Sequence, residues 1–173
     1  MTQYSKRMVI VHWLTLLLLV VAWFLGDELD EARHEAGATL IGYVAHALVG
    51  GAILLLVFAR LYFRAEDGTP PPIGNTPMDK VAKGIHHGLY VVLLLLPITG
   101  IVTLVSSDVL KALQAGDASL LPHKFSGIFA HDAHEMLVTV LIVLVVVHLL
   151  GALKHQFISK DGLLERMSLR RKE

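Results

Sequence analysis

Residues 131–155, with the sequence HDAHEMLVTVLIVLVVVHLLGALKH, decide the fold. The middle of this stretch, residues 136–147, carries no charge and consists almost entirely of Leu, Val and Ile, which is typical of a membrane-spanning helix. His134 and His148 bracket the apolar run. On a helix this spacing places them within about 40° of the same face and about 21 Å apart along the axis. Two imidazoles on one face, at opposite depths of a bilayer, predict two stacked sites.

Composition and apolar runs together predict an all-α integral membrane protein, a four-helix bundle in a single domain. The chain has 173 residues, of which 54% are hydrophobic and 17% charged, with a mean hydropathy of +0.62. A soluble domain of this size carries more charge. The first apolar run is expected to be a retained helix, because it is long for a signal peptide and lacks a small-x-small cleavage site. The predicted spans cover residues 8–26, 38–62, 85–107 and 131–153.

The segments between the spans have distinct characters. Residues 27–35, DELDEARHE, are acidic and are expected to form a loop that leads into the second helix. Pro97 and Gly100 predict a kink in the third span. Residues 106–130 are long for a simple connection, so they are expected to carry a short helix or to cover a site. The basic tail, residues 154–173, alternates apolar and polar residues and is expected to lie at the membrane surface.

The distribution of Lys and Arg predicts the orientation. Of the fifteen basic residues, Arg33, Lys111 and Lys124 fall in two of the connections. The positive-inside rule places the other connection and both termini in the cytoplasm. The remaining twelve basic residues are at positions 6, 7, 60, 64, 80, 83, 154, 160, 166, 170, 171 and 172.

Two classes of function are excluded by composition. Cysteine is absent, so disulfides, thiolate metal sites and covalent haem attachment through Cys-x-x-Cys-His are impossible. The basic residues border apolar runs and form no separate basic face, so no nucleic-acid partner is expected.

Four of the ten histidines match in pairs when their depth is counted from the cytoplasmic charged borders. His12 lies about 7 Å from its border and His148 about 9 Å, by helical rise. His46 lies about 27 Å and His134 about 30 Å from theirs. The sequence therefore predicts an inner pair, His12 with His148, and an outer pair, His46 with His134.

Paired histidines in a bundle core are typical of haem coordination, since haem iron accepts two axial imidazoles on opposite faces of the macrocycle. Zinc requires further ligands close by, which these pairs do not offer at zinc-site spacing. Two alternatives remain. The histidines could form interhelical hydrogen bonds in an ordinary bundle, or a haem-free bundle could bind metal or lipid through them.

The other membrane-border histidines are candidates for a quinone or proton site, although interfacial histidines that face lipid headgroups are equally compatible with their positions. His131 lies one helical turn before His134 and could replace it as a ligand; otherwise it is expected to be solvated. The quinone or proton candidates are His155, His86, His87 and Tyr90.

Several segments resemble the bacterial cytochrome b561 family, whose small members are four-helix di-haem proteins. They are YSKRMVIVHWL, RLYFR, HHGLYVVLLLLPITG, HEMLVTVL and HLLGALKHQFISKDGLLERM, and the resemblance covers nearly the whole chain. It is strongest toward the superoxide oxidase type. The resemblance implies a multi-pass protein of the bacterial inner membrane that binds two haem b and passes electrons from superoxide outside to ubiquinone. It also implies that His12, His46, His134 and His148 are the axial ligands, and that His155 and His86 or His87 lie near the quinone or the haem propionates.

The outer segments depart from what a superoxide-collecting surface requires, because an anion is attracted by positive charge. Nine carboxylates are predicted there against three basic residues, so only a local cluster of Arg33, Lys111 and Lys124 could form a positive funnel. An alternative function follows from this charge. The chain could be a membrane-anchoring cytochrome b subunit that passes electrons between the quinone pool and a separate periplasmic redox protein.

Overall fold

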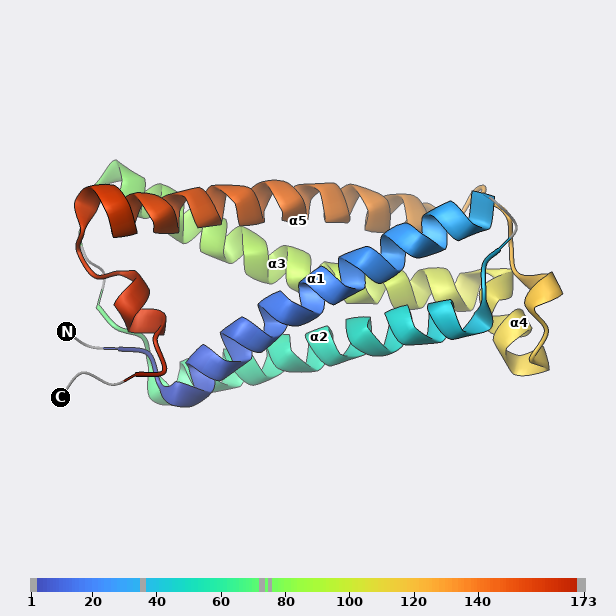
Figure 1. The fold of residues 1–173 in the computed structure, drawn as a ribbon, viewed down its shortest axis with the longest axis horizontal. Helices are drawn as coiled ribbons and strands as arrows, with labels where there is room; N and C mark the ends of the chain where they lie inside the picture. Colours follow the sequence, from blue (N-terminus) through green and yellow to red (C-terminus); the bar gives the residue numbers. More distant parts are fainter. Residues whose placement is uncertain (1–2, 35–36, 72–73, 75, 171–173) are drawn as a thin grey trace.

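The structure is a computed structural model that describes residues 3–34, 37–71, 74 and 76–170. Within these residues four long helices form a bundle, and each contains an apolar window long enough to cross a membrane. The predicted fold class, an all-α integral membrane bundle, is confirmed. The four helices, labelled in Figure 1, are α1 (Lys6–His34), α2 (Leu40–Asp67), α3 (Pro77–Ser106) and α5 (Phe129–Lys154).

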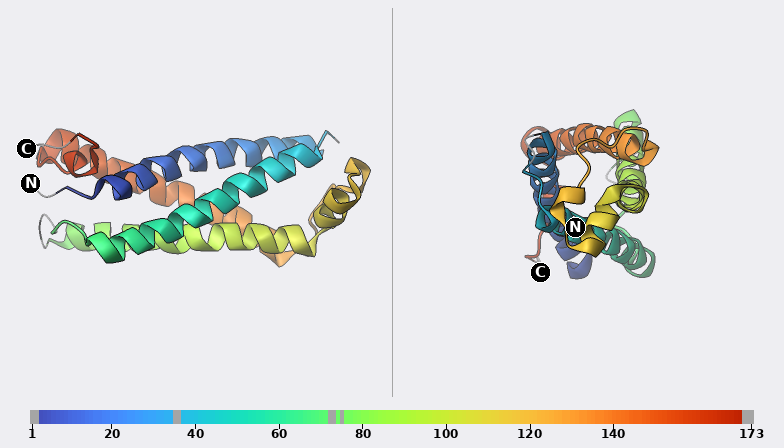
Figure 2. Two further views of the ribbon diagram at one scale, coloured as in Figure 1. Left: turned by 90° about the horizontal axis from the view of Figure 1, so that it is seen from below. Right: turned by 90° about the vertical axis from the view of Figure 1, so that its right-hand side faces the viewer.

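The helices form two antiparallel pairs. Helix α1 packs mainly against α2, and α3 packs mainly against α5, while contacts between α2 and α3 join the two pairs. Both termini lie at one end of the bundle (Figure 1), which is the end that the charge distribution assigns to the cytoplasm. The short helix α4 (Asp108–Ala115) lies across the opposite end (Figure 2). We call these the inner and the outer end.

The acidic segment after the first span is helical, and the prediction of a loop over residues 27–35 is wrong for the described part, which extends to His34. Helix α1 continues unbroken to this residue. Good helix formers, without Gly or Pro between positions 27 and 34, sustain the helix beyond its apolar part. An ion pair between Asp30 and Arg33, three residues apart, adds local support.

The connection between α3 and α5 carries short helices, as predicted. Helix α4 is followed directly by Gly116, which adopts a left-handed conformation (φ 67°) that favours glycine. A 3-10 turn, η1 (Ala118–Leu120), follows. Side chains from α4 and the loop form a buried cluster at the outer end, consisting of Val109, Ala112, Leu121 and Phe125. The outer end is therefore covered by a packed cap.

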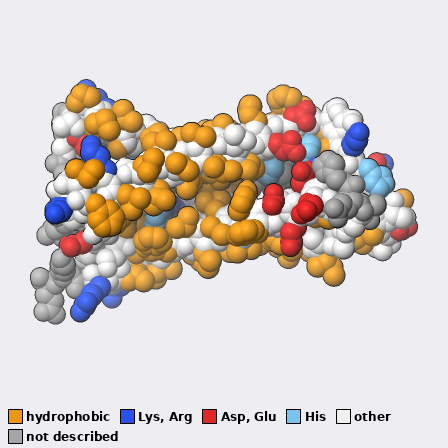
Figure 3. Space-filling model, turned by 45° about the horizontal axis from the view of Figure 1, so that its top comes forward, with side chains coloured by type: hydrophobic (Ala, Val, Ile, Leu, Met, Phe, Trp, Pro, Cys, Tyr) orange, Lys and Arg blue, Asp and Glu red, His pale blue; other side chains and the backbone are white. Residues whose placement is uncertain are grey.

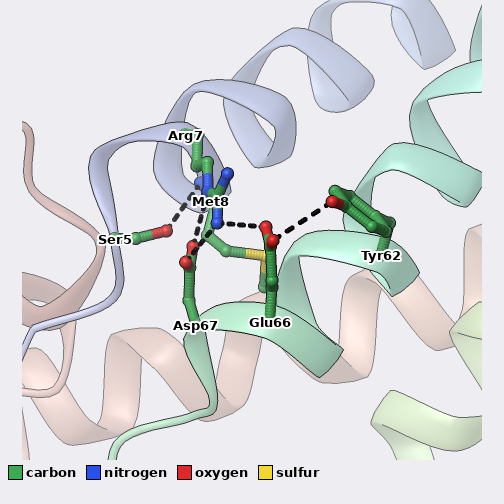
Figure 4. A network of polar contacts seen from close by, with 6 residues as sticks. All are labelled: Ser5, Arg7, Met8, Tyr62, Glu66 and Asp67. Atoms are coloured by element: carbon green, nitrogen blue, oxygen red, sulfur yellow. Dashed lines mark hydrogen bonds and ion pairs between the residues drawn. The ribbon is translucent and has the colours of Figure 1, made fainter.

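A charged network joins the first turn of α1 to the last turn of α2 at the inner end (Figure 4). The Arg7 guanidinium donates to both carboxylate oxygens of Asp67, at 2.5 and 2.8 Å, and to Glu66 at 2.6 Å. The Tyr62 hydroxyl also donates to Glu66, at 3.1 Å, and Arg7 lies over the Phe63 ring. Because α1 begins where α2 ends, this network fixes the antiparallel register of the two helices.

The chain after α5 folds back across the inner end. A π-helical turn, η2 (His155–Ser159), and a 3-10 turn, η3 (Leu164–Met167), form this segment. The Trp13 indole Nε1 donates to the carbonyl of Met167 at 3.0 Å. The backbone N–H of Tyr4 donates to the carbonyl of Arg166 at 3.1 Å. The tail therefore contacts the beginning of α1, one residue from His12.

The interior and the surface of the bundle suit a membrane protein that encloses a ligand. On the face shown in Figure 3, apolar side chains cover the middle of the molecule, while charged side chains gather toward its ends. Exposed apolar residues such as Ile41 and Leu55, which are 80% and 71% exposed, suit contact with lipid tails. Helix α5, which is described over its whole length, has no fully buried residue. The space beside it is occupied by cavities.

Candidate functional site

The structure brings the four predicted ligand histidines together in the predicted pairs. The ring centroids of His46 on α2 and His134 on α5 are 6.2 Å apart. Those of His12 on α1 and His148 on α5 are 6.4 Å apart. The ring planes of the two pairs make angles of 71° and 70°. Helix α5 thus contributes one imidazole to each of two levels.

The His134 ring rests against the backbone of α3. Its Nδ1 lies 2.9 Å from the carbonyl of Leu96 and 3.1 Å from the hydroxyl of Thr99. Because a carbonyl can only accept, Nδ1 carries the proton in this contact. A Cβ atom placed on Gly100 would lie 3.3 Å from Cε1 of this ring, so glycine permits the close approach. The Nε2 of His134 is left as the nitrogen with a free lone pair.

The His46 ring is seated in the same manner against α1. A Cβ atom placed on Gly26 would lie 3.2 Å from its Cε1 and 3.6 Å from its Nδ1. The backbone of Ala22 lies beside the ring, but Nδ1 is buried and reaches no partner within hydrogen-bond geometry. As with His134, the Nδ1 edge of the ring faces a helix backbone, which leaves Nε2 for a ligand.

Two cavities meet at the outer pair. One, of about 250 Å³, extends into the middle of the bundle, and its lining includes Leu16 and Leu141. The other, of about 360 Å³, extends toward the outer end, and its lining includes Arg33. His46 and His134 line both cavities. The residues that the two cavities share are Ala22, Trp23, His46, Gly50, Pro97, His134 and Val138.

The inner pair has more polar surroundings. Nη1 of Arg60 lies 2.8 Å from Nδ1 of His12, and Nε of Arg60 donates to the Tyr90 hydroxyl at 2.9 Å. Because a guanidinium only donates, Nδ1 of His12 accepts here and the proton of the neutral ring is on Nε2. For His12 to bind a metal through Nε2, this contact must rearrange.

A third histidine touches the inner pair. The His86 ring lies 5.1 Å from the His148 ring, centroid to centroid. This distance is shorter than the separation within either pair and is that of two rings in direct edge contact. His86 and Tyr90, both predicted quinone or proton candidates, therefore lie beside the inner pair.

The other two quinone or proton candidates, His87 and His155, have partners of their own. Nδ1 of His87 lies 2.7 Å from the carbonyl of Lys83 on its own helix, and the side chain is exposed. His155 begins the π-helical turn, where its Nδ1 lies 2.5 Å from Asp161. Neither of these two contacts involves the inner pair.

The His131 ring is packed against other side chains, so the expectation of a solvated ring is wrong. Its side chain is 19% exposed, and its ring stacks on Phe125 at 4.3 Å. Nε2 lies 3.1 Å from Glu135 and 3.5 Å from Arg33. The cap over the outer end accounts for this burial, because it supplies the Phe125 ring.

Both pairs have the spacing that haem requires. Two metal–imidazole bonds of about 2 Å each, together with the ring nitrogen-to-centroid distances, separate two trans imidazoles by about 6 Å, centroid to centroid. Both ring planes then contain the bond axis, so any angle between the planes is compatible. A Cβ atom on Gly50 would meet nothing within 4 Å. At the outer pair this open space is available to a flat ligand.

The outer surface is acidic. Asp27, Glu28, Glu31 and Glu135 are exposed there, and acidic side chains gather at the outer end in Figure 3. Among the three basic residues that could form a positive funnel, Lys111 is paired with Asp108 at 2.7 Å. Arg33 is paired with Asp30 and is only 9% exposed. Each of these two cations therefore already has one carboxylate partner.

Sequence reasoning did not single out several groups that position the histidines, namely Gly26, Arg60, Leu96 and Thr99. Arg60 was counted only as a border charge. Its place inside an apolar run was the available signal, because an arginine at membrane depth usually has a specific partner. Nothing in the sequence marks the carbonyl of Leu96.

A bundle of four membrane-spanning helices with histidine pairs at two levels has the architecture of a membrane-bound cytochrome b. Comparison with known proteins agrees with this class. The chain belongs to the prokaryotic cytochrome b561 family, whose profile matches residues 3–168. The predicted family is confirmed.

Individual relatives align over almost their full length. Cytochrome b562 of Cereibacter sphaeroides is 30% identical over 168 residues, which are 95% of this chain and 94% of the relative. A probable superoxide oxidase, CybB, of Yersinia pestis is 30% identical over 95% of each chain. Cytochrome b561 homolog 1 of Escherichia coli K12 is 26% identical over 99% of this chain and 100% of the relative.

Family membership and the four apolar helices define the protein at a general level. It is a multi-pass protein of the bacterial inner membrane that functions in electron transport, as an oxidoreductase that binds haem b.

Proposed function

We propose that the protein transfers electrons across the membrane through two haem b groups, from superoxide at the outer end to ubiquinone at the inner end. The observation that carries this proposal is the pair of centroid distances, 6.2 Å for His46 with His134 and 6.4 Å for His12 with His148. One macrocycle cannot bridge a hydrocarbon core of about 30 Å, so two levels are needed.

The histidines hold and orient the cofactors. Haem, when bound, supplies a one-electron carrier at each level. His46 and His134 would hold the outer group, with Nδ1 of His134 donating to Leu96 so that Nε2 faces the metal. His12 and His148 would hold the inner group. Because two histidines would hold each haem, the iron would have no position left for a small molecule, and the donor would react at the edge of the site.

The inner end offers groups that can supply protons to a quinone, which takes up two protons and two electrons to become a quinol. His86 and Tyr90 lie beside the inner pair. His155 is farther along the chain and is hydrogen-bonded to Asp161. An imidazole can take up a proton at one ring nitrogen and release one from the other, so His86 and His155 are suited to this role. His87 faces its own helix and is the weakest of the four candidates.

Spectroscopy of single-ligand variants tests the haem assignment. The purified protein is expected to show a low-spin b-type spectrum with two haems per chain. His148→Ala is expected to remove the inner haem and to leave the outer one. Two haems in this variant, with an unchanged low-spin spectrum, would exclude His148 as a ligand.

A pulse of superoxide tests the donor. Protein in quinone-containing vesicles is expected to form quinol within the pulse, and His134→Ala, which lacks the outer ligand, is expected to form none. If the intact protein binds two haems but remains oxidised during the pulse, superoxide is not the donor.

A second candidate function is supported by the acidic outer surface. Exposed carboxylates such as Asp27 and Glu31, together with the local pairing of Arg33, suit a basic redox protein better than a small anion. In this case the chain would anchor and serve a separate periplasmic partner. Electron transfer from a basic protein donor, with a rate that falls steeply as salt is added, would favour this function.

A further inference from the structure

We propose that Arg33 binds the propionate carboxylates of the outer haem, which therefore lies with its carboxylate edge toward the outer end of the bundle. The inference rests on the proposed outer pair, His46 and His134. It adds a binding residue and an orientation that the pair alone does not supply.

The two cavities at the outer pair differ in polarity in the way that a haem does. The central cavity is lined by aliphatic and aromatic side chains, apart from the two histidines. The outer cavity is lined in part by charged residues, among them Asp30 and Arg33. A haem has one edge of methyl and vinyl groups and one edge with two carboxylates. Placed between the histidines, it would extend into both cavities, and its carboxylates would be stable only in the outer one.

Arg33 has unused hydrogen-bonding capacity at this position. Its side chain is 9% exposed, and its Nε is buried without a hydrogen-bond partner. Asp30 accepts from Nη2, and Nε2 of His131 lies 3.5 Å from Nη1. A buried arginine donor without a partner is costly and rare in native proteins. A carboxylate in the outer cavity would supply the missing acceptor.

The position of the guanidinium is fixed by the cap. Its Cζ lies 4.9 Å from the centre of the Phe125 ring, and the same ring stacks on His131 at 4.3 Å. Phe125 is 8% exposed and belongs to the buried cluster at the outer end. The charge is therefore held at the cavity wall and is not free to turn into solvent.

Electrostatics require a cation here if carboxylates are to enter. Asp27, Asp30 and Glu135 also line the outer cavity, and they would repel a propionate. Among the described residues of this lining, Arg33 is the one permanent cation. Its fork of donors matches the geometry of a carboxylate.

Reconstitution with haem and with haem dimethyl ester, which has no carboxylate charge, tests the proposal. Protein made without haem is loaded in detergent with each compound, and occupancy of the outer site is measured from the spectrum of reduced protein. The wild type is expected to prefer haem over the ester by about tenfold to a hundredfold at the outer site. Arg33→Gln is expected to bind both compounds equally, and Arg33→Lys is expected to recover part of the preference.

Lys111→Gln is the matched control, because it removes an outer-end cation that is 76% exposed and paired with Asp108; it is expected to keep the full preference. The inner haem serves as an internal reference in every variant. Helix content by circular dichroism confirms that the Arg33 variants fold. The proposal is wrong if Arg33→Gln keeps the wild-type preference for haem over the ester at the outer site. A wild type without preference also overturns it.

Two further results separate the sources of error. A chloride titration compares the reduction potential of the outer haem in the wild type and in Arg33→Gln. If chloride shifts this potential only in the wild type, while both proteins keep the preference for haem, Arg33 binds a solution anion and the proposal is wrong. If His134→Ala binds as much haem as the wild type, the proposed outer pair is wrong, and the role of Arg33 is wrong with it. If two haems bind normally and only the preference is unaffected by Arg33, the proposed function stands without this residue.

Discussion

The outer and inner histidine pairs have almost the same ring separation, 6.2 and 6.4 Å, but different surroundings. At the outer pair, both rings lie with their Nδ1 edges against glycines of neighbouring helices, Gly26 and Gly100. At the inner pair, the His12 ring accepts a hydrogen bond from Arg60, and His86 lies against His148. The spacing of the rings is shared, while the supporting groups are not.

The difference between the surroundings of the two pairs indicates what each level needs for its proposed role. The backbone at Gly26 and at Gly100 forms two glycine seats, which fix the rings of the outer pair before a cofactor binds. This is the arrangement of a preorganised site. The inner pair instead lies among groups that can exchange protons and hydrogen bonds. The proposed reduction of a quinone, which takes up protons as well as electrons, needs such groups, and the inner histidines are held less firmly than the outer ones.

The largest expected contrast comes from removing one ligand at each level. His46→Ala is expected to eliminate the outer haem completely, because His131, the nearest other histidine, is held against Phe125. His12→Ala is expected to retain part of the inner haem, because His86 already touches His148 and can take the empty axial position after a rotamer change. Haem content per chain and the low-spin spectrum measure both outcomes.

The double variant His12→Ala/His86→Ala is the control for this contrast, and it is expected to lack the inner haem entirely. Equal and complete loss in His12→Ala and His46→Ala would show that His86 cannot substitute. The inner pair would then be as strictly defined as the outer pair.

A methyl group added to a glycine seat is expected to have the next largest effect. In Gly100→Ala the new Cβ would lie 3.3 Å from Cε1 of His134, so the ring must move by a few tenths of an ångström. Displacement of a metal ligand by its supporting groups lowers cofactor affinity by about tenfold. The outer haem is expected to be lost more readily to apomyoglobin, while the inner haem dissociates at its normal rate.

Gly84→Ala is the matched control on the same helix, because a Cβ there would meet nothing within 4 Å. This substitution is expected to leave both haems unchanged and to stabilise the helix by up to about 1 kcal/mol. Faster haem loss in Gly84→Ala than in Gly100→Ala would mean that helix packing in general, and not the seat of His134, controls retention.

Much of this architecture could be predicted from the sequence, because the signals were local. The apolar runs predicted the fold class, and depth counted along single helices placed His12 level with His148 and His46 level with His134. The acidic segment was predicted incorrectly, because its charge was taken as a loop signal although Glu, Leu, Ala and Arg favour helix.

The seats of the rings could not be predicted, because they depend on how helices distant in sequence approach each other. Gly100 was interpreted only as part of a kink. The residues around it in the sequence do not indicate its contact with His134, which lies on another helix. The burial of Arg33 likewise depends on a cap that is contributed by residues about ninety positions later. One sequence without packing information shows that a charge is present but not what covers it.

A smaller effect is expected from the hydroxyl beside His134. Thr99→Val removes one of the two oxygens near Nδ1, but the carbonyl of Leu96 at 2.9 Å remains. A single neutral hydrogen bond contributes about 1 kcal/mol, so the outer haem is expected to dissociate less than tenfold faster. A loss as large as that of Gly100→Ala would show that Thr99, and not the carbonyl, orients the ring. Thr103→Val, one turn away, provides the comparison, since its hydroxyl donates within its own helix.

The smallest effect concerns the inner end, where the tail is held by Asp161. Burial raises the pKa of Asp161, but hydrogen bonds from His155 and from the backbone N–H of Leu163 outweigh it, so the pKa lies below its ordinary value. A lowered pKa stabilises the docked tail above the ordinary pKa of aspartate, about 4, and this stabilisation is lost as pH falls through the lower value. The Trp13 indole, hydrogen-bonded to Met167, reports docking by its emission in a Trp23→Phe background.

Emission from Trp13 is therefore expected to change on acidification through the lowered pKa of Asp161. In Asp161→Asn it is expected to change little with pH and to resemble the acid form throughout. Asp117→Asn is the control, because hydrogen bonds from Ser119 also lower the pKa of Asp117, but this carboxylate lies at the outer end. If Asp161→Asn kept the pH dependence of the wild type, another group would hold the tail. The inner level would then be as rigid as the outer one, and the contrast between them would be confined to the rings themselves.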